Sequence, residues 1–352
     1  MKFRSTVGQA PMVGFCEALL QGIAPDGGLY VPEKFPSVDL TDFAGASTPA
    51  QVGAIMLAPF ARGSELEASL PVICQEAFSF PIPLKSIPSD AGPLHVLELF
   101  HGPTAAFKDV GARFLAACFE RLNGSEQLPL TILVATSGDT GGAVAAAFHG
   151  RANTRVVVLF PKGLVSGRQE KQLCCWGDNV LSLRVNGNFD DCQRMVKQAF
   201  ADAKFNQAVR LSSANSINLG RLLPQAVYYA CASLNYWRAT GEKLNFVIPT
   251  GNLGNGQACV WAKTMGFPIG KIVFATNENR PIPDYLETGN WAPGASVATL
   301  ASAMDVGNPS NMERLRDLLP DVGKMRAAVS AYPVSDEDIR RQISRDEVAR
   351  GE

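Results

Sequence analysis

Long apolar runs are missing from this sequence. A membrane-spanning helix needs about eighteen or more consecutive apolar residues, and no stretch reaches that length; the N-terminal MKFRSTVGQAPMVGF also has no apolar signal-peptide core. The formal net charge is only -1, so no overall field would recruit nucleic acid or an anionic membrane. These absences predict a cytoplasmic protein that binds neither membranes nor nucleic acid.

Metal-binding and disulfide patterns are missing as well. The eight cysteines include no CxxC pair, and the three histidines form no HExxH motif and lie far from any suitable cysteine pair. In a chain of 352 residues this scatter is typical of reduced cytosolic thiols, most of them in the core. The sequence therefore predicts no metal site.

What the sequence does contain is an alternation of two kinds of segment. Apolar residues make up 46% and charged residues 18%, the balance of a globular enzyme. Short runs rich in β-branched residues occur at 131–136, 155–160, 179–185, 244–250 and 271–276, and helical patterns between them at 141–148, 192–200 and 219–237. Such an alternation predicts an α/β fold with parallel sheets covered by helices on both faces, and the length predicts two lobes.

The N-terminal part of the chain has a different pattern. Proline and glycine punctuate GIAPDGGLYVPEKFP and FSFPIPL around a helical stretch near 50–60. We expect a smaller N-terminal region over 1–85, packed on an α/β core over 86–352, with the boundary between Pro81 and Asp90.

A first candidate site is the loop ATSGDTGGAVAAAF, which follows the run at 131–136. Ligands bind at the carboxyl ends of parallel strands, and here Ser137, Thr140 and the amides around Gly138 and Gly141 could surround an anion at a helix N-terminus. The alternative is that Asp139 or Thr140 caps the helix and that the glycines allow close packing on the sheet.

A second candidate site is the loop PTGNLGNGQA, after the run at 244–250. Gly251, Asn252, Gly254, Asn255 and Gly256 can expose successive backbone amides that suit a phosphate without a lysine. The Lys-Ser/Thr pair of a Walker loop is absent. Ordinary turn chemistry is the alternative.

A third candidate site is SSANSINLGRLLPQ, at 212–225. Asn215, Ser216 and Asn218 offer directional hydrogen bonds, and Arg221 is a planar cation suited to a carboxylate or phosphate. Helix capping and a solvated surface arginine would also account for these residues, and on this segment alone that alternative is favoured.

A lysine follows the turn HGPT and precedes a helical pattern. Val110, Phe114 and Cys118 repeat at helical spacing, which places Lys108 at or near a helix N-terminus. A partly desolvated amine there should have a lowered pKa, as imine formation requires; a surface lysine paired with Asp109 is the alternative. A nucleophilic lysine together with a phosphate nest is the minimal set of groups for pyridoxal phosphate.

These motifs together resemble those of the threonine synthase family. HGPTAAFKD, ATSGDTGGAVA, SANSIN and GNLGN occur in the family's order, and QGIAPDGGLYVP resembles the opening segment of its longer bacterial and fungal branch. The resemblance implies a fold-type II pyridoxal-phosphate enzyme, similar to tryptophan synthase β. It also implies conversion of O-phospho-L-homoserine and water to L-threonine and phosphate.

The resemblance further implies roles for individual residues. Lys108 would be the imine lysine and proton shuttle. The cofactor phosphate cup would be Gly251, Asn252, Leu253, Gly254 and Asn255. The substrate would be bordered by Ser137, Gly138, Asp139 and Thr140, and its carboxylate or phosphate held by Asn215, Ser216 and Arg221. The partner would be a small-molecule substrate, and the assembly a monomer or homodimer.

The C-terminal stretch SDEDIRRQISRDEVARGE departs from the family pattern. Ser335 and Asp338 predict a capping box, and Ile339 and Ile343 begin an amphipathic helix. Family members continue past this helix with a segment that supplies a hydroxyl residue facing the ring nitrogen of the cofactor. This sequence has no match to that segment, so we expect either a truncated sequence or a reduced relative.

Three other functions compete with this interpretation. The first is a fold-type II dehydratase or lyase acting on an unphosphorylated amino acid. The second is a non-catalytic protein that keeps the ligand pocket. A nicotinamide dehydrogenase is disfavoured, because the glycine spacing is wrong and the run at 155–160 is not followed by the acid that would hold a ribose.

Overall fold

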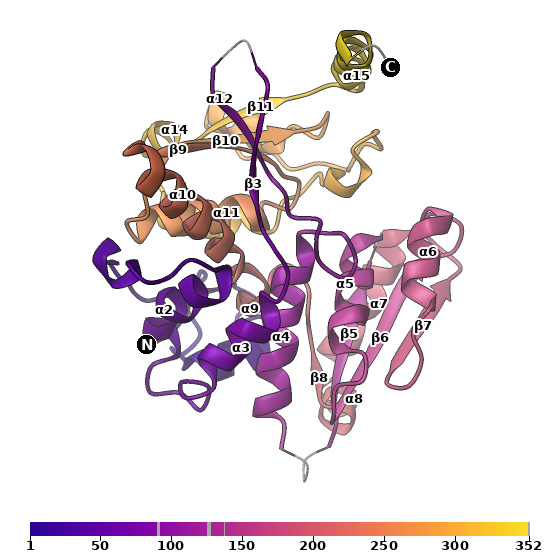
Figure 1. The fold of residues 1–352 in the computed structure, drawn as a ribbon. Coiled ribbons are helices and arrows are strands. Elements are labelled where there is room, and N and C mark those ends of the chain that lie inside the picture. Colours follow the sequence, from indigo (N-terminus) through magenta and orange to yellow (C-terminus); the bar gives the residue numbers. More distant parts are fainter. Residues whose placement is uncertain (90–91, 125–127, 137, 351–352) are drawn as a thin grey trace.

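Two parallel sheets organise the chain (Figure 1). The structure is a computed structural model that describes residues 1–89, 92–124, 128–136 and 138–350. The first sheet has the order β7-β6-β5-β8 and contains β5 (Leu130–Ala135), β6 (Thr154–Pro161), β7 (Val180–Val185) and β8 (Leu211–Ser212). The second has the order β11-β10-β9 and contains β9 (Leu244–Pro249), β10 (Ile269–Thr276) and β11 (Ser330–Pro333). The five strands predicted from apolar runs are confirmed.

Helices cover both faces of the first sheet. Ile132 and Val134 of β5 belong to the main core, together with buried residues of α4 (Lys108–Leu122) and α5 (Asp139–Phe148). Leu133 and Ala135 point to the opposite face, where they form a second cluster with Val196 of α7 (Phe189–Ala201). α6 (Gly167–Cys174) contacts β7, and α8 (Ala203–Val209) contacts α7. This arrangement explains why the strands are apolar without strict alternation.

The second sheet is covered differently on its two faces. Leu244, Phe246 and Ile248 of β9 lie in the main core, on the side of α10 (Gln225–Thr240) and α11 (Gly254–Thr264). Between them, Val247 is 70% exposed, and Tyr332 of β11 is 62% exposed. The expectation of a sheet covered on both faces therefore holds for the first sheet, whereas the second presents an open face in the described residues.

The helix predicted over 219–237 is two helices. α9 (Leu219–Leu222) ends before Pro224, and α10 begins at Gln225 with Pro224 as its N-cap. Proline has no amide hydrogen to continue the helix, and its ring clashes with the preceding turn. The prediction of one helix was wrong because it followed apolar spacing across the proline.

The N-terminal residues form small elements against the same core. They are β1 (Phe3–Ser5), α1 (Phe15–Gln21), β2 (Tyr30–Pro32), η1 (Leu40–Phe43), α2 (Pro49–Ala61) and α3 (Leu70–Ala77), followed by the antiparallel pair β3 (Leu84–Ile87) and β4 (Leu94–Leu97). α2 confirms the helix predicted near 50–60. Phe3 and Phe60 are fully buried in the main core, so this part of the chain shares its hydrophobic interior with the sheets.

The remaining C-terminal elements follow β10 along the chain. They are α12 (Pro281–Thr288), η2 (Ser302–Met304), α13 (Met312–Leu318), α14 (Val322–Ala328) and α15 (Asp336–Arg350). The predicted capping box is confirmed, because Ser335 Oγ accepts from Asp338 N at 3.1 Å and Asp338 Oδ2 accepts from Ser335 N at 3.3 Å. Ile343 of α15 is 53% exposed. Among the described residues, no helix combines the length and apolarity needed to cross a membrane.

Candidate active site

A rigid turn delivers Lys108 to the first position of α4, as the sequence predicts. Asp109 is 1% exposed, and it accepts hydrogen bonds from Thr104 N at 2.9 Å and Thr104 Oγ1 at 2.7 Å. A side chain at Gly102 would place its Cβ 2.5 Å from Asp109 Oδ2, so only glycine fits there. Asp109 thus fixes the turn, and the carboxylate nearest Lys108 belongs to another residue.

That carboxylate is Asp139, whose Oδ2 lies 3.7 Å from Lys108 Nζ. The Lys108 side chain is only 17% exposed. Burial lowers the pKa of Lys108 below 10.5, Asp139 opposes the shift, and the positive charge of Arg221 adds to it. The lowered pKa expected from the sequence is confirmed, with desolvation as its main cause.

Lys108 opens into a cavity of about 1240 Å³ between the two sheets. The predicted site residues that line it are Lys108, Asp139, Thr140, Asn215, Ser216, Arg221, Gly251, Asn252, Leu253, Gly254 and Asn255. Gly138 is buried and is not among the residues that line the cavity; a Cβ on it would meet the side chain of Gln169. Ser137 lies outside the described residues. The three candidate loops therefore meet around one lysine.

The asparagine side chains of the turn 251–255 are engaged in hydrogen bonds within the protein. Asn252 donates from Nδ2 to Ser216 Oγ at 2.6 Å, and its Oδ1 accepts from Ser310 N at 2.6 Å. Asn255 is likewise used within the turn, accepting from Thr250 Oγ1 at 2.6 Å. At the start of α11, Gly256 N donates to Asn255 Oδ1 and Gln257 N donates to Leu253 O, both at 2.9 Å. The amides of Gly254 and Asn255 have no intrahelical partners, so they suit an anion.

The same turn holds a conformation that is unusual for its residues. Leu253 has φ of 60°, a left-handed backbone that is uncommon for a leucine and costs about 1 kcal/mol or more. A Cβ on Gly251 would lie 2.8 Å from the backbone of Met304. The turn is therefore constrained by the backbone of Met304 as well as by its own hydrogen bonds.

Arg221 is a buried cation on the cavity wall. It is 1% exposed, and it donates from Nη1 to Ala214 O. Its Nε finds no hydrogen-bond partner among the described residues. Burial lowers its pKa to about 10, against the attraction of Asp109, so the group stays charged at neutral pH. A charged guanidinium with an unused donor beside a cavity suits an anionic ligand.

The loop before α5 is held by a hydroxyl and an amide. Thr136 Oγ1 accepts from Gly138 N and Gly141 N, both at 3.0 Å. On the other side, Gln169 Nε2 donates to Asp139 Oδ1 at 3.0 Å, while its Oε1 accepts from Ser166 N at 3.1 Å. Asp139 is therefore oriented by α6 before it meets Lys108.

Several lining residues were missed by sequence reasoning. Gln169 stands in a capping pattern with Ser166, a signal that marks a helix start but not a contact with Asp139. Leu20, Gln21, Ile23, Ala24 and Pro25 of the N-terminal region reach the same cavity, and so do residues 294–296 and 302–308. Neither segment has a local sequence pattern that predicts a place in the cavity wall, because contacts between residues far apart in sequence put it there.

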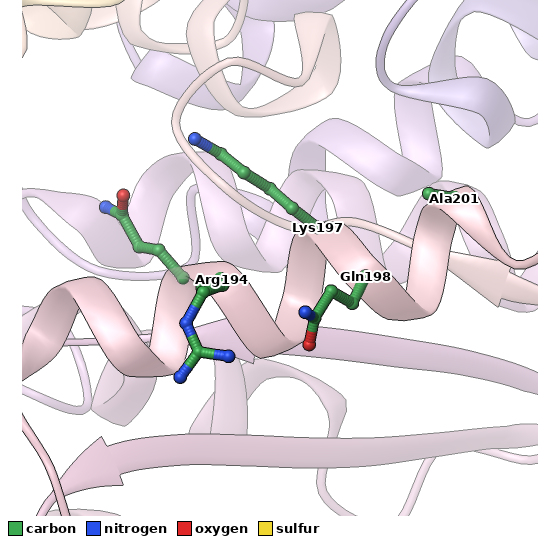
Figure 2. A pocket seen from close by; sticks show the side chains of 5 residues that line it. Arg194, Lys197, Gln198 and Ala201 are labelled. Carbon is green, nitrogen blue, oxygen red and sulfur yellow. The ribbon is translucent and has the colours of Figure 1, made fainter.

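A second hollow lies along α7 (Figure 2), and two of its lining residues, Gln193 and Lys197, also line the large cavity. Its volume is about 520 Å³, and its lining is Gln193, Arg194, Lys197, Gln198 and Ala201. Arg194 is paired with Asp191 at 3.0 Å, and both side chains are well exposed. These features are those of an ordinary solvated helix face, and we assign no ligand to it.

Two family profiles match the chain. The profile described as pyridoxal-phosphate dependent enzyme covers residues 81–346, and the profile described as threonine synthase N terminus covers residues 2–78. Threonine synthase of Haemophilus influenzae is 42% identical over 306 residues, which are 87% of this chain and 71% of that protein. Threonine synthase of Escherichia coli is 41% identical over 326 residues, or 90% and 74%.

Solved structures agree with the sequence matches. The pyridoxal-phosphate-bound threonine synthase of Brucella melitensis superposes with a TM-score of 0.86 and 38% identity, covering 95% of this chain and 78% of that one. Threonine synthase of Escherichia coli also gives 0.86, with 39% identity and coverage of 96% and 78%. Maize serine racemase, at a TM-score of 0.52 and 16% identity, shares the fold alone; the match covers 73% of each chain.

Proposed function

This chain belongs to the threonine synthase family of pyridoxal-phosphate-dependent enzymes, and from that premise we propose that Lys108 carries the cofactor. Its function is that of a pyridoxal-phosphate-dependent threonine synthase. The proposed reaction converts O-phospho-L-homoserine and water to L-threonine and phosphate. One observation carries the assignment of the site: an amine with a lowered pKa and an amide-rich turn open into the same cavity.

The residues of the cavity fit pyridoxal phosphate on chemical grounds. Burial favours the neutral, nucleophilic form of the Lys108 amine. The amides of Gly254 and Asn255 at the start of α11 suit the cofactor phosphate, whereas Gly256 N already donates to Asn255 Oδ1 at 2.9 Å. The cavity volume of about 1240 Å³ is ample for a cofactor and a small substrate.

When bound, pyridoxal phosphate supplies an electron sink that the side chains themselves lack. Lys108 Nζ would take up and return protons, because burial lowers its pKa while Asp139 stabilises its charged form. Asp139, held by Gln169, stabilises the ammonium form. These residues would then govern proton movement beside the substrate.

A second anion site is proposed for the substrate. Arg221 contributes a buried positive charge and an unused Nε donor. Asn215 and Ser216 lie on the same cavity wall, and with Arg221 they would hold the phosphate or carboxylate of the substrate. Gly138, Asp139 and Thr140 would border its other end. A phosphate leaving group needs such a cation where its charge develops.

The wider organisation is proposed on the same basis. We infer a threonine-synthase-type N-terminal region over 1–85 and a pyridoxal-phosphate-binding core in two lobes over 86–352; the division between the two family profiles supports this. We further propose a cytoplasmic monomer or homodimer acting on a small molecule, without nucleic acid or a membrane as partner.

The test of function is substrate turnover by the purified, cofactor-loaded protein. Threonine and phosphate should form in equal amounts from O-phospho-L-homoserine, and serine and threonine should not be consumed at a comparable rate. Consumption of serine or threonine alone would instead indicate a dehydratase. Cofactor binding without any phosphate release would indicate a protein that keeps the pocket but not the chemistry.

A further inference from the structure

Arg314 of α13 is a second buried guanidinium, outside the cavity. It is 0% exposed, and it lies over the ring of Trp261 of α11, 6.0 Å from the ring centroid. Burial lowers its pKa to about 9, with Glu313 and Asp317 opposing the shift, so it remains charged at neutral pH. Burying such a charge is costly unless its donors are used.

Its hydrogen bonds go to three separate parts of the chain. Nε donates to Tyr30 O at 3.0 Å, Nη2 donates to Ile217 O at 2.7 Å, and Nη1 donates to Asn311 Oδ1 at 2.7 Å. All three acceptors are neutral oxygens. One side chain thus joins β2, the segment before α9 and the start of α13.

Asn311 passes this constraint to the turn 251–255. Its Nδ2 donates to Asn252 O at 3.1 Å and to Ser216 O at 3.4 Å, and its backbone N donates to the same Asn252 O at 3.4 Å. Two donors therefore hold the carbonyl of the peptide that leads into Leu253. That residue has the left-handed φ of 60°, which persists only where surrounding contacts enforce it.

We propose that Arg314 is a positioning residue for the cofactor phosphate: through Asn311 it fixes the Asn252 carbonyl, and so the direction of the amides that follow in the turn. This inference rests on the proposed function, since it assumes that the turn 251–255 binds that phosphate. The arginine itself touches no ligand. A planar guanidinium can hold three acceptors in place because its N–H donors have fixed angles to one another, whereas a lysine ammonium does not provide this geometry.

The test compares two ligands that differ only in the phosphate. Cofactor-free protein is prepared from the holoenzyme of the wild type, Arg314→Met and Arg314→Lys, and each is titrated with pyridoxal phosphate and with pyridoxal. We expect Arg314→Met to lose about tenfold or more of its preference for pyridoxal phosphate over pyridoxal. The ligand preference of Arg314→Lys should fall between those of the wild type and Arg314→Met. If Arg314→Met does not fold, Asn311→Ala should show the same loss of preference.

Arg238 offers a control at an exposed position. It also donates to two backbone carbonyls, Ala46 O at 2.8 Å and Phe43 O, but it lies on α10 away from the turn. Arg238→Met should lower the melting temperature and leave the ligand preference unchanged. An unchanged preference in the Arg314 and Asn311 variants would overturn the inference. A wild type that does not prefer the phosphorylated ligand would instead overturn the phosphate cup, and the inference with it.

Discussion

At the scale of single residues, Lys108 is governed by two opposing effects. Burial favours its neutral form, and Asp139 at 3.7 Å favours its charged form. Burial prevails, so the folded-state pKa lies below 10.5. Between the folded-state pKa and 10.5, the unfolded chain therefore binds more protons than the folded chain. The free energy of unfolding rises with pH across that range.

Lys108→Met should remove both the chemistry and this pH dependence. Turnover should fall by at least about a hundredfold, because no other amine replaces the proton carrier. In the cofactor-free protein, the unfolding free energy should rise less steeply than in the wild type as the pH increases toward 10.5. Urea unfolding at several pH values measures this. The control Lys34→Met, at an exposed position, should retain the rise; a rise of equal size in Lys108→Met would contradict the account.

At the scale of elements, the close approach of α4 and α9 places Lys108 and Arg221 on one cavity. A Cβ on Gly111 of α4 would lie 2.4 Å from Arg221 O, so the two backbones meet with no room for a methyl group. Because α9 is short and ends at Leu222, a steric clash between a side chain at position 111 and the Arg221 backbone would displace Arg221.

Gly111→Ala should therefore destabilise the protein by about 2–4 kcal/mol and raise the KM for the phosphorylated substrate. Gly142→Ala in α5 is the matched control, since its Cβ would meet only Gln172 Cβ at 3.8 Å. That change should stabilise the protein by about 0.5–1 kcal/mol. Denaturant unfolding and steady-state kinetics of both variants provide the check, and equal effects of the two substitutions would refute this packing argument.

The predictability of elements differs from that of their contacts. Runs such as 131–136 and 244–250 predict strands because burial acts on neighbouring residues, and the spacing after Lys108 predicts a helix for the same reason. The bond between Asn252 and Ser216 joins residues far apart in sequence, as does the one between Gln169 and Asp139. No local pattern encodes such bonds. Pro224, in contrast, is a local signal: it predicts the break between α9 and α10, although the apolar spacing continues across it.

At the scale of the whole molecule, the N-terminal region lines part of the large cavity. Ile23, Ala24 and Pro25 line it, and the next residue, Asp26, holds their loop. Asp26 Oδ1 accepts from Ser5 Oγ at 2.6 Å and Gly28 N at 3.0 Å, and Oδ2 accepts from two further backbone amides. The bond from Ser5 is the main cause that lowers the pKa of Asp26 from 3.8 to about 2.

Asp26→Asn should loosen this loop and raise the KM for the substrate several-fold without changing the affinity for the cofactor. The contribution of Asp26 to the free energy of unfolding is fully present above pH 3.8, and it is lost as the pH falls through about 2. The difference in Tm between wild type and variant should therefore shrink over that range. Asp39→Asn is the control, because Asp39 caps η1 away from the cavity. A KM change of the same size in both variants would count against a role for the loop.

The central claim is that one amine, Lys108, carries the cofactor in a cavity shared by both lobes and the N-terminal region. Its most direct test is borohydride reduction of the cofactor-loaded protein, followed by peptide mapping. The account predicts a single reduced pyridoxyl group, on Lys108. A label on any other lysine, or threonine synthesis by a protein in which Lys108 stays unlabelled, would contradict it.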